Sequence, residues 1–301
     1  MIKRSDIIKC LGKFPKKCKL DVKIIKSIEK PKYIIKEISY NVESNERIKA
    51  LLLIPKNIIK KTPGILALHQ HALQYNLGKS ESAGIKGNKM YAYGLELCLK
   101  GYIVLCPDHF CFEDRQDTKL KRGDFERFCF TKYLLEGSTL QAKYISDLVC
   151  ALNVIKSYSK VDKKNIGVIG HSLGGQETLW LMWYDKSIKC GVPSCGFSKI
   201  KDIVDKKIIH SFSTYIPNFF KYGDIDDIVS FVAPRAFLMI SGENDEIFPI
   251  NAVKEIEVKA NKSYLKIKSQ NNFKALYFKG NHSFPKQMRQ KAYEWFDLHL
   301  K

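Results

Sequence analysis

The stretch Ile166-Gly-Val-Ile-Gly-His-Ser-Leu-Gly-Gly175 decides the fold. Its first four residues predict a short buried strand, and the residues from Gly174 onward predict a helix. The turn between them has the Gly-x-Ser-x-Gly pattern of a nucleophile elbow, a serine held on a strand-to-helix reversal. Such a reversal strains the backbone of Ser172 and leaves no room for a Cβ at Gly170 or Gly174. The pattern therefore predicts a serine hydroxyl at a strand end, beside the N-terminus of a helix.

Strand and helix patterns alternate on both sides of this turn. This alternation predicts an α/β fold, with a mostly parallel central sheet and helices on both faces. Two antiparallel strands are expected to lead into the sheet. The expected strands are 33–40, 46–54, 64–69, 101–106, 166–169, 188–193, 236–240 and 273–278, and the expected helices are 89–100, 139–158, 174 onward, 251–260 and 285–300.

The 301 residues are expected to form one domain, since no Pro/Gly/Ser-rich linker divides them. Residues 1–30 are a lysine-rich N-terminal arm without a clear period, apart from a short helical pattern at 4–11. Two interruptions, 109–138 and 196–234, are long for a compact domain, and segments of that length usually serve function. We expect the second, which is rich in aromatic residues, to be a small helical lid insertion.

The formal charge of +20 is compatible with nucleic-acid binding, but only seven of the 51 basic residues are Arg. The lysines are scattered along the chain rather than gathered on one element. This distribution favours a solvated surface over a binding groove, so no nucleic-acid partner is expected.

The cysteines number nine, lack the two-residue spacing of zinc pairs, and several stand within apolar patterns. They predict reduced thiols in a cytoplasmic protein, and neither a metal nor a cofactor is expected. No apolar run is long enough for a signal peptide or a membrane span, so no membrane partner is expected. A homo-oligomer is left open.

A serine hydroxyl attacks only when a base removes its proton, and a carboxylate must orient that base. In the elbow architecture the acid and then the base follow the serine, each in a loop after a later strand. His282 follows the last expected strand and is the predicted base for Ser172. Asp245, in the loop after the strand 236–240, is the favoured acid. Glu243 and Glu246 in the same loop remain alternatives.

The tetrahedral intermediate needs backbone N–H donors for its oxyanion. Leu173, which follows the nucleophile, supplies one donor, and His71 after the strand 64–69 is the expected second donor. His69 and His71 also stand two residues apart at a strand end, as a pair of metal ligands would. No third ligand is evident in the sequence.

Further side chains are expected at the mouth of the site because they follow strands that end at the same edge of the sheet. Arg115 is a candidate anchor for a polar or anionic part of the substrate, although it is about equally expected to pair with a neighbouring carboxylate on the surface. Charges at the mouth would disfavour long acyl chains and predict short ones. The candidates are His69, Gln70, Glu113, Asp114, Arg115 and His171, with Phe219, Phe220 and Tyr222 on the opposite wall.

Several motifs together resemble the α/β-hydrolases of the dienelactone hydrolase and acetyl xylan esterase-like group, over roughly residues 33–300. They are His69-Gln-His71, Gly78-Lys-Ser-Glu81, Gly101-Tyr-Ile-Val-Leu-Cys-Pro-Asp108, Phe112-Glu-Asp-Arg115, Asp147, Val161-Asp162 and the elbow. The resemblance implies an α/β-hydrolase fold and a serine hydrolase that cleaves a carboxylic ester of a small molecule through an acyl-enzyme. Dienelactone hydrolases proper carry Cys where this chain has Ser172. A peptidase of the prolyl oligopeptidase kind and a non-catalytic binding protein of the same fold are the alternatives.

Overall fold

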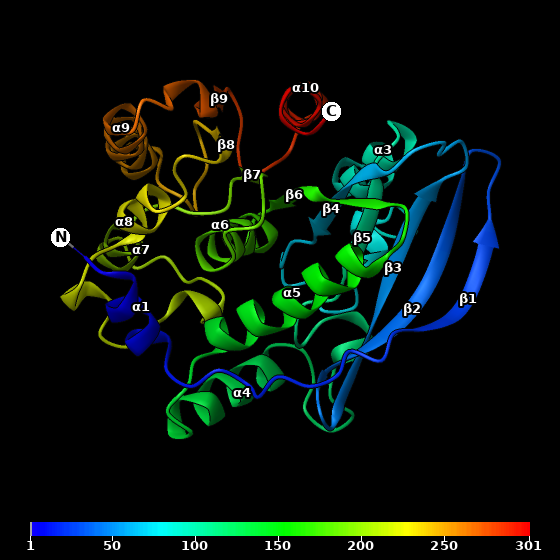
Figure 1. Cartoon of the computed structure of the whole chain (residues 1–301). Coiled ribbons are helices and arrows are strands. Elements are labelled where there is room, and N and C mark those ends of the chain that lie inside the picture. The colour runs from blue at the N-terminus through cyan, green and yellow to red at the C-terminus, as the bar shows by residue number, and fades with distance from the viewer. Residues whose placement is uncertain (1) are drawn as a thin grey trace.

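A nine-stranded sheet forms the centre of the molecule in the computed structural model, which describes residues 2–301 (Figure 1). The strand order is β1-β2-β3-β5-β4-β6-β7-β8-β9. The strands β1 to β3 are antiparallel, and β4 to β9 run parallel to one another. The strands are β1 (Lys23–Glu29), β2 (Tyr33–Glu43), β3 (Glu46–Pro55), β4 (Thr62–Leu68), β5 (Ile103–Pro107), β6 (Val161–His171), β7 (Cys190–Ser194), β8 (Ala236–Gly242) and β9 (Phe273–Phe278).

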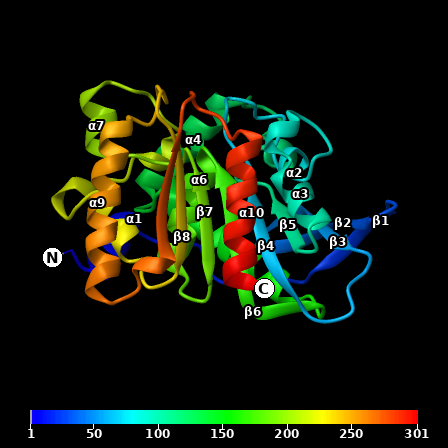
Figure 2. The ribbon, with the colours of Figure 1, turned by 90° about the horizontal axis from the view of Figure 1, so that it is seen from above.

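The predicted α/β architecture is confirmed, because helices cover both faces of this sheet (Figure 2). The inner strands β5, β7 and β8 are buried along their whole length, as apolar strands between two helical layers are. One core lies under α1, α5, α6, α8 and α9, and a second lies under α3 and α10. These helices are α1 (Arg4–Leu11), α3 (Tyr93–Leu99), α5 (Leu140–Ser157), α6 (Leu173–Tyr184), α8 (Ile225–Ser230), α9 (Ile250–Lys266) and α10 (Lys286–Leu300).

The N-terminal arm is more ordered than expected. The predicted helix at 4–11 is confirmed as α1, and its residues Ile7 and Leu11 belong to the core. The strand β1, which lies within the expected arm 1–30, was not predicted. The sequence gives no alternating pattern there because the side chains of β1 are almost all exposed. Backbone pairing with β2 holds this edge strand instead.

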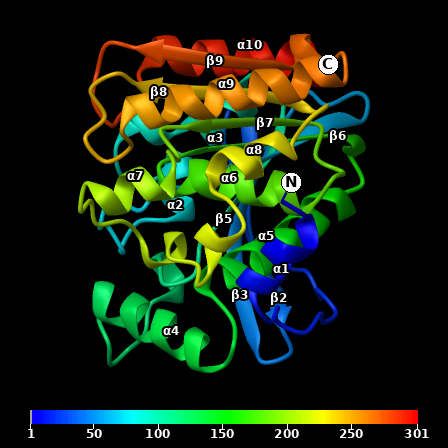
Figure 3. The same cartoon turned by 90° about the vertical axis from the view of Figure 1, so that its left-hand side faces the viewer.

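The two long interruptions carry short helices rather than plain loops (Figure 3). The first contains η2 (Glu113–Arg115) and α4 (Gly123–Leu135), and α4 stands apart from the sheet. The second contains α7 (Ile200–Asp205), η3 (Phe212–Thr214), η4 (Phe219–Lys221) and α8, so the expected helical content is present. The remaining short elements are α2 (Lys79–Ser82), η1 (Lys89–Tyr91) and η5 (Gln270–Asn272).

Within residues 2–301, no helix is long and apolar enough to cross a membrane. All nine cysteines are free thiols, and seven of them are buried, among them Cys98, Cys106 and Cys190.

A buried polar network joins α5, α6 and the second interruption. Glu177 is fully buried on α6, and Gln141 Nε2 donates to its Oε2 at 2.7 Å. Gln176 Nε2 donates to Gln141 Oε1 and to Ser213 Oγ, both at 3.0 Å. Burial raises the pKa of Glu177 from 4.5 to about 8, so its carboxyl is largely protonated at neutral pH.

This raised pKa predicts a pH-dependent stability. The unfolded carboxyl ionises above its pKa of 4.5, whereas the folded carboxyl keeps its proton up to about pH 8. The contribution of Glu177 to stability is therefore greatest below the lower pKa and falls, by up to about 1.4 kcal/mol per pH unit, as the pH rises toward the upper one. Glu177→Gln should remove this slope. Urea unfolding at about pH 6 and about pH 8 measures it, and equal pH slopes in both proteins would contradict the assignment.

Candidate functional site

The carboxyl ends of the parallel strands meet beside Ser172. Strand β6 ends immediately before it, and the amide N–H of Ser172 donates to the carbonyl of Ser194 at the end of β7. The cross-strand register fixes this meeting point through the pairs Leu68–Gly170, His171–Ser194, Ser194–Ile240 and Gly242–Phe278. The loops after β4, β7, β8 and β9 consequently converge on the first turn of α6, as ligand sites in parallel sheets do.

The elbow has the strained geometry that the sequence predicts. Ser172 has φ 55° and ψ −121°, a conformation that a residue with a side chain rarely adopts. A Cβ on Gly170 would lie 2.2 Å from the carbonyl carbon of Gly174, and a Cβ on Gly174 would lie 2.1 Å from the carbonyl oxygen of Leu68. Only glycine therefore fits at these two positions, and α6 starts directly against the ends of β4 and β6.

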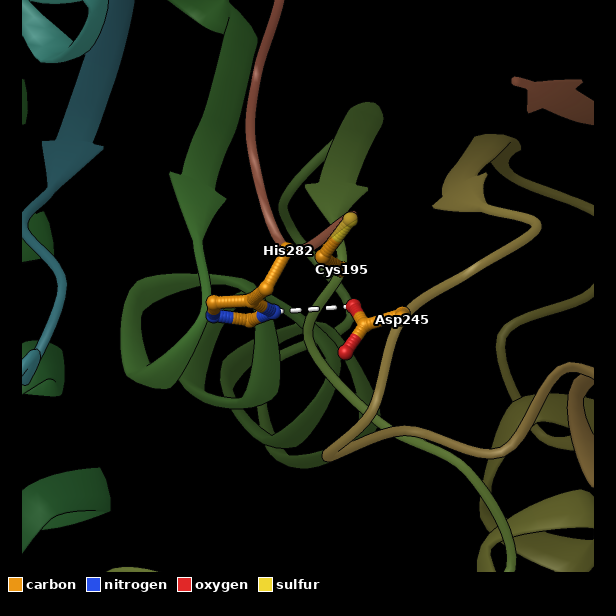
Figure 4. A group of neighbouring side chains, drawn as sticks. All are labelled: Cys195, Asp245 and His282. Atoms are coloured by element: carbon orange, nitrogen blue, oxygen red, sulfur yellow. Dashed lines mark hydrogen bonds and ion pairs between the residues drawn. The ribbon is translucent and has the colours of Figure 1, made fainter. Parts of the chain in front are cut away.

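The structure brings His282 and Asp245 together. His282 Nδ1 donates to Asp245 Oδ2 at 2.8 Å, and the carboxyl group is almost fully buried (Figure 4). The backbone N–H groups of Ile247 and Phe248 donate to Asp245 Oδ1, each at 3.1 Å. The aspartate is thus held by three donors, and it orients the imidazole ring.

Of the three acids left open by the sequence, only Asp245 contacts His282. Glu243 and Glu246 are exposed in the same loop. The reason is the close approach of the loops after β8 and β9, where a Cβ on Gly242 would lie 2.6 Å from the carbonyl oxygens of Gly280 and Asn281. This approach leaves the position next to the imidazole to the short side chain of Asp245.

Ser172 and His282 line one open cavity of about 1580 Å³. Leu173 and His71, the expected oxyanion residues, line the same cavity. Leu173 is the first residue of α6, where a helix leaves its N–H groups without an intrahelical partner. The predicted nucleophile, base and oxyanion residues thus share a single space, with Asp245 behind the base.

Arg115 and Glu113 do not line this cavity, which corrects the expectation that they flank the substrate. Arg115 is buried, and its guanidinium donates to Asp147 at 2.7 Å and to Glu46 at 2.6 Å. Glu113 and Asp114 instead accept hydrogen bonds from the buried ammonium of Lys79, each at 2.9 Å. Arg115 therefore neither anchors the substrate nor pairs with a neighbouring carboxylate on the surface. It pairs instead with carboxylates that are distant in sequence. The expectation of short acyl chains consequently loses the support of these three charged residues.

His69, Gln70 and His171 surround the site without lining the cavity. The Nε2 atom of His69 accepts from the backbone N–H of His109 at 3.0 Å, and burial lowers the pKa of His69 to about 4. Gln70 Nε2 donates to Glu81 at 3.1 Å. The buried ring of His171 packs against the imidazole of His282 at a tilt of 40°, with 4.7 Å between centroids. These three side chains support the loops and the base.

Phe219 and Phe220 also lie away from the cavity, so they do not form its opposite wall. Phe219 is buried against Trp180, with 5.9 Å between ring centroids, and Phe220 is 53% exposed. Of the second interruption, the chain from Ile209 to Phe212 reaches the cavity. The predicted lid therefore contributes one short stretch, and α4 supplies the facing wall.

Sequence reasoning missed the residues of α4 and two aromatic residues that line the cavity. Glu126 and Arg127 on α4, together with Arg122 before it, line the cavity. So do His210 and Phe248, whose rings pack together at a tilt of 46° with 4.6 Å between centroids. The helix α4 has apolar side chains on several sides, with Phe128 and Leu135 exposed, so no periodic face marked it as a helix.

Cys195 stands beside the base and its acid, as Figure 4 shows. Its Sγ and the ligand atoms of Asp245 and His282 lie within 4.8 Å of one another. Burial raises the pKa of Cys195 to about 12, so the sulfur is a neutral thiol at physiological pH, and it contacts the carbonyl oxygen of Ser283 at 3.5 Å. With both Asp245 oxygens already accepting hydrogen bonds, this group is a supported acid–base pair rather than a set of free metal ligands.

Comparisons with known proteins agree with this fold. Residues 3–296 match a family described as the abhydrolase family. YtaP of Bacillus subtilis strain 168, named as a hydrolase, is 30% identical over 258 residues, which cover 85% of this chain and 84% of that protein. A Bacteroides fragilis structure described as an acetyl xylan esterase superposes with a TM-score of 0.75 at 21% identity, covering 95% of this chain and 78% of that one. The glucuronoyl esterase of Solibacter usitatus gives 0.72 at 14% identity, covering 98% and 91%.

The contact of Gly174 with Leu68 predicts that Gly174→Ala severely destabilises the protein. A Cβ placed 2.1 Å from a backbone oxygen forces α6 away from the end of β4, and we expect a loss of more than about 4 kcal/mol of unfolding free energy. Gly101→Ala is the matched control, since a Cβ there meets nothing within 4 Å. Its positive φ should cost only about 1–2 kcal/mol. Equal losses in urea unfolding would show that the close approach is unimportant.

Proposed function

The chain belongs to the abhydrolase family, and on this basis we propose that it cleaves carboxylic esters of small molecules through an acyl-enzyme intermediate. The observation that carries the proposal is the hydrogen bond of 2.8 Å between His282 Nδ1 and Asp245 Oδ2. The two residues lie in loops that converge on the strained Ser172. An oriented imidazole beside a serine on an elbow is the arrangement that serine hydrolases use to activate their nucleophile.

In the proposed mechanism each group has one role. Because Nδ1 of His282 donates its proton to Asp245, Nε2 is the nitrogen that accepts the proton of Ser172. The serine oxygen then attacks the ester carbonyl, and the imidazolium returns the proton to the departing alcohol. Water repeats the sequence on the acyl-enzyme, which releases the acid and restores the serine. Asp245 keeps the ring in one tautomer and stabilises its positive charge.

We propose the backbone N–H groups of Leu173 and His71 as donors to the oxyanion. Leu173 begins α6, so its N–H also lies at the positive end of the helix dipole. The pairing of Leu68 with Gly170 places the loop that carries His71 beside the elbow. Donors fixed in this way stabilise the charge that develops on the carbonyl oxygen, which is where most of the rate acceleration of acyl transfer originates.

A peptidase and a binding protein are the remaining alternatives. A binding protein of this fold has no need for an oriented Asp245–His282 pair at a strained Ser172, so the geometry favours the enzyme. Covalent labelling of Ser172 by a fluorophosphonate would distinguish a serine hydrolase from a binding protein. We also infer a cytoplasmic location and no nucleic-acid partner, which nine free thiols and scattered surface lysines support.

The triad predicts the effect of three substitutions on ester hydrolysis. Ser172→Ala and His282→Ala should each lower kcat by roughly 10⁴-fold or more, because nucleophile and base act as one unit. Asp245→Asn should lower kcat by at least about 10²-fold, since the amide favours the wrong imidazole tautomer. Glu243→Gln and Glu246→Gln, in the same loop, serve as matched controls with turnover near that of the wild type. Near-normal turnover by Ser172→Ala would refute the mechanism.

We further expect acetyl to butyryl esters to be cleaved faster than long-chain esters. The support is now the likeness to a structure described as an acetyl xylan esterase, because the charged residues first expected at the mouth lie elsewhere. The values of kcat/KM on p-nitrophenyl esters of increasing acyl length test this preference. An optimum at about eight carbons or more would overturn it while leaving ester hydrolysis itself intact.

A further inference from the structure

Cys195 is a buried side chain beside the triad for which the proposed mechanism has no role. It directly follows Ser194, the last residue of β7, whose carbonyl accepts the amide N–H of Ser172 at 2.9 Å. Its own sulfur lies beside the other two members of the triad, since the Sγ atom and the ligand atoms of Asp245 and His282 are within 4.8 Å of one another (Figure 4). Two adjacent residues after β7 are thus next to all three members of the triad.

The backbone of Cys195 has a conformation that favours glycine. Its φ is 42°, in the left-handed region that residues with a side chain rarely occupy. The next residue, Gly196, packs tightly on the first turn of α6, where a Cβ on it would lie 2.4 Å from the carbonyl carbon of Gly175. Strained residues of this kind cluster at active sites, where the surrounding structure holds them. A cysteine in place of glycine here indicates that its side chain is used.

The thiol of Cys195 is a hydrogen-bond donor and not a second nucleophile. Burial raises the pKa of Cys195 to about 12, so the sulfur keeps its proton at neutral pH. Its S–H group donates to the carbonyl oxygen of Ser283, the residue after the base, at 3.5 Å. Asp245 already accepts from His282 and from two backbone N–H groups of its own loop. The contact of the thiol with Ser283 therefore leaves the charge of the acid to the imidazole.

The bond from Cys195 to Ser283 joins the sheet to the loop that carries the base. The backbone N–H of Cys195 donates to the carbonyl of Ile240 in β8 at 2.8 Å, so the sheet fixes the position of its Cα. The sulfur extends this anchor to the residue that follows His282. The imidazole ring itself is held by the acid and by two flanking rings. The thiol consequently acts on the backbone beside the base, not on the ring.

We propose that Cys195 is a positioning residue of the triad, whose thiol holds the carbonyl of Ser283 and thereby sets the distance between His282 Nε2 and the hydroxyl of Ser172. The inference rests on the proposed esterase function and adds a fourth residue to its machinery. A catalytic group displaced by about 1 Å can lose about 10²-fold in rate, so one contact of this kind has a measurable effect.

Cys195→Ala and Cys195→Ser test the proposal, with Cys190→Ala as the matched control. Cys190 is just as buried but lies at the opposite end of β7. Cys195→Ala should lower kcat on p-nitrophenyl acetate about tenfold or more, with KM unchanged because the side chain does not line the cavity. Cys195→Ser should keep kcat within about threefold of the wild type, since its hydroxyl can donate to the same carbonyl. Cys190→Ala should lose thermal stability and keep its kcat.

Two kinetic results would overturn the proposal. A kcat of Cys195→Ala no lower than that of Cys190→Ala would show that the thiol only fills space. Equal losses of kcat in the two Cys195 variants would show that the hydrogen bond to Ser283 plays no part. Should Cys195→Ala fail to fold, Cys195→Ser decides alone, and a loss of kcat beyond about threefold in it contradicts the role of the bond.

The NMR resonance of the His282 Nδ1 proton is a second readout, and it needs no substrate. This proton lies in the hydrogen bond to Asp245, so its resonance should shift in Cys195→Ala and stay in place in Cys190→Ala. An unchanged resonance in Cys195→Ala would count against the proposal. If the wild type hydrolyses no ester faster than Ser172→Ala does, the esterase function fails, and the resonance still shows whether Cys195 positions the imidazole.

Discussion

The approach of α6 to the ends of β4 and β6 is the constraint on which the rest of the site depends. Gly170 and Gly174 let a helix begin where a strand ends, with backbone atoms of adjacent elements in direct contact. The nucleophile is consequently held by the backbone alone, in a conformation that its own side chain disfavours. The nine-stranded sheet supplies the rigidity that sustains this strain, because β6 is paired on both sides by parallel strands. The packing of the entire core thus offsets the backbone strain at Ser172.

The loops that carry the acid and the base are also positioned by the meeting of α6 with the strand ends, although they come from more distant strands. Strands β8 and β9 lie beyond β7 in the sheet, and their loops reach back across its end to meet the elbow. Asp245 is anchored by the backbone of its own loop, and His282 is enclosed between the rings of His171 and Phe248. Since every group that orients the imidazole is itself buried or bonded to backbone, the arrangement is organised before any substrate arrives.

The sequence was informative wherever a feature repeats or is required by sterics. Periodicity located all the parallel strands and the long helices other than α4. The elbow pattern located Ser172, and the order of the loops after it indicated His282 and favoured Asp245 over Glu243 and Glu246. It was uninformative where side chains are exposed or bonded across long separations. Strand β1 has almost no buried face, and α4 has no consistent one. The ion pairs of Arg115 with Glu46 and Asp147 join residues more than 30 positions apart, so no local pattern could exclude Arg115 from the cavity.

The helix α4 differs from the other long helices in how little of it is buried. Only Glu126 and Cys129 are buried along its 13 residues, and it stands clear of the sheet. Elements with so few apolar contacts open locally at a small fraction of the global unfolding free energy. The cavity wall formed by α4 can therefore open locally while the elbow, held between β4 and β6, keeps its structure. In evolutionary terms, substitutions in α4 can change which ligands the cavity accepts. They do so with little loss of stability in the part of the fold that holds the nucleophile.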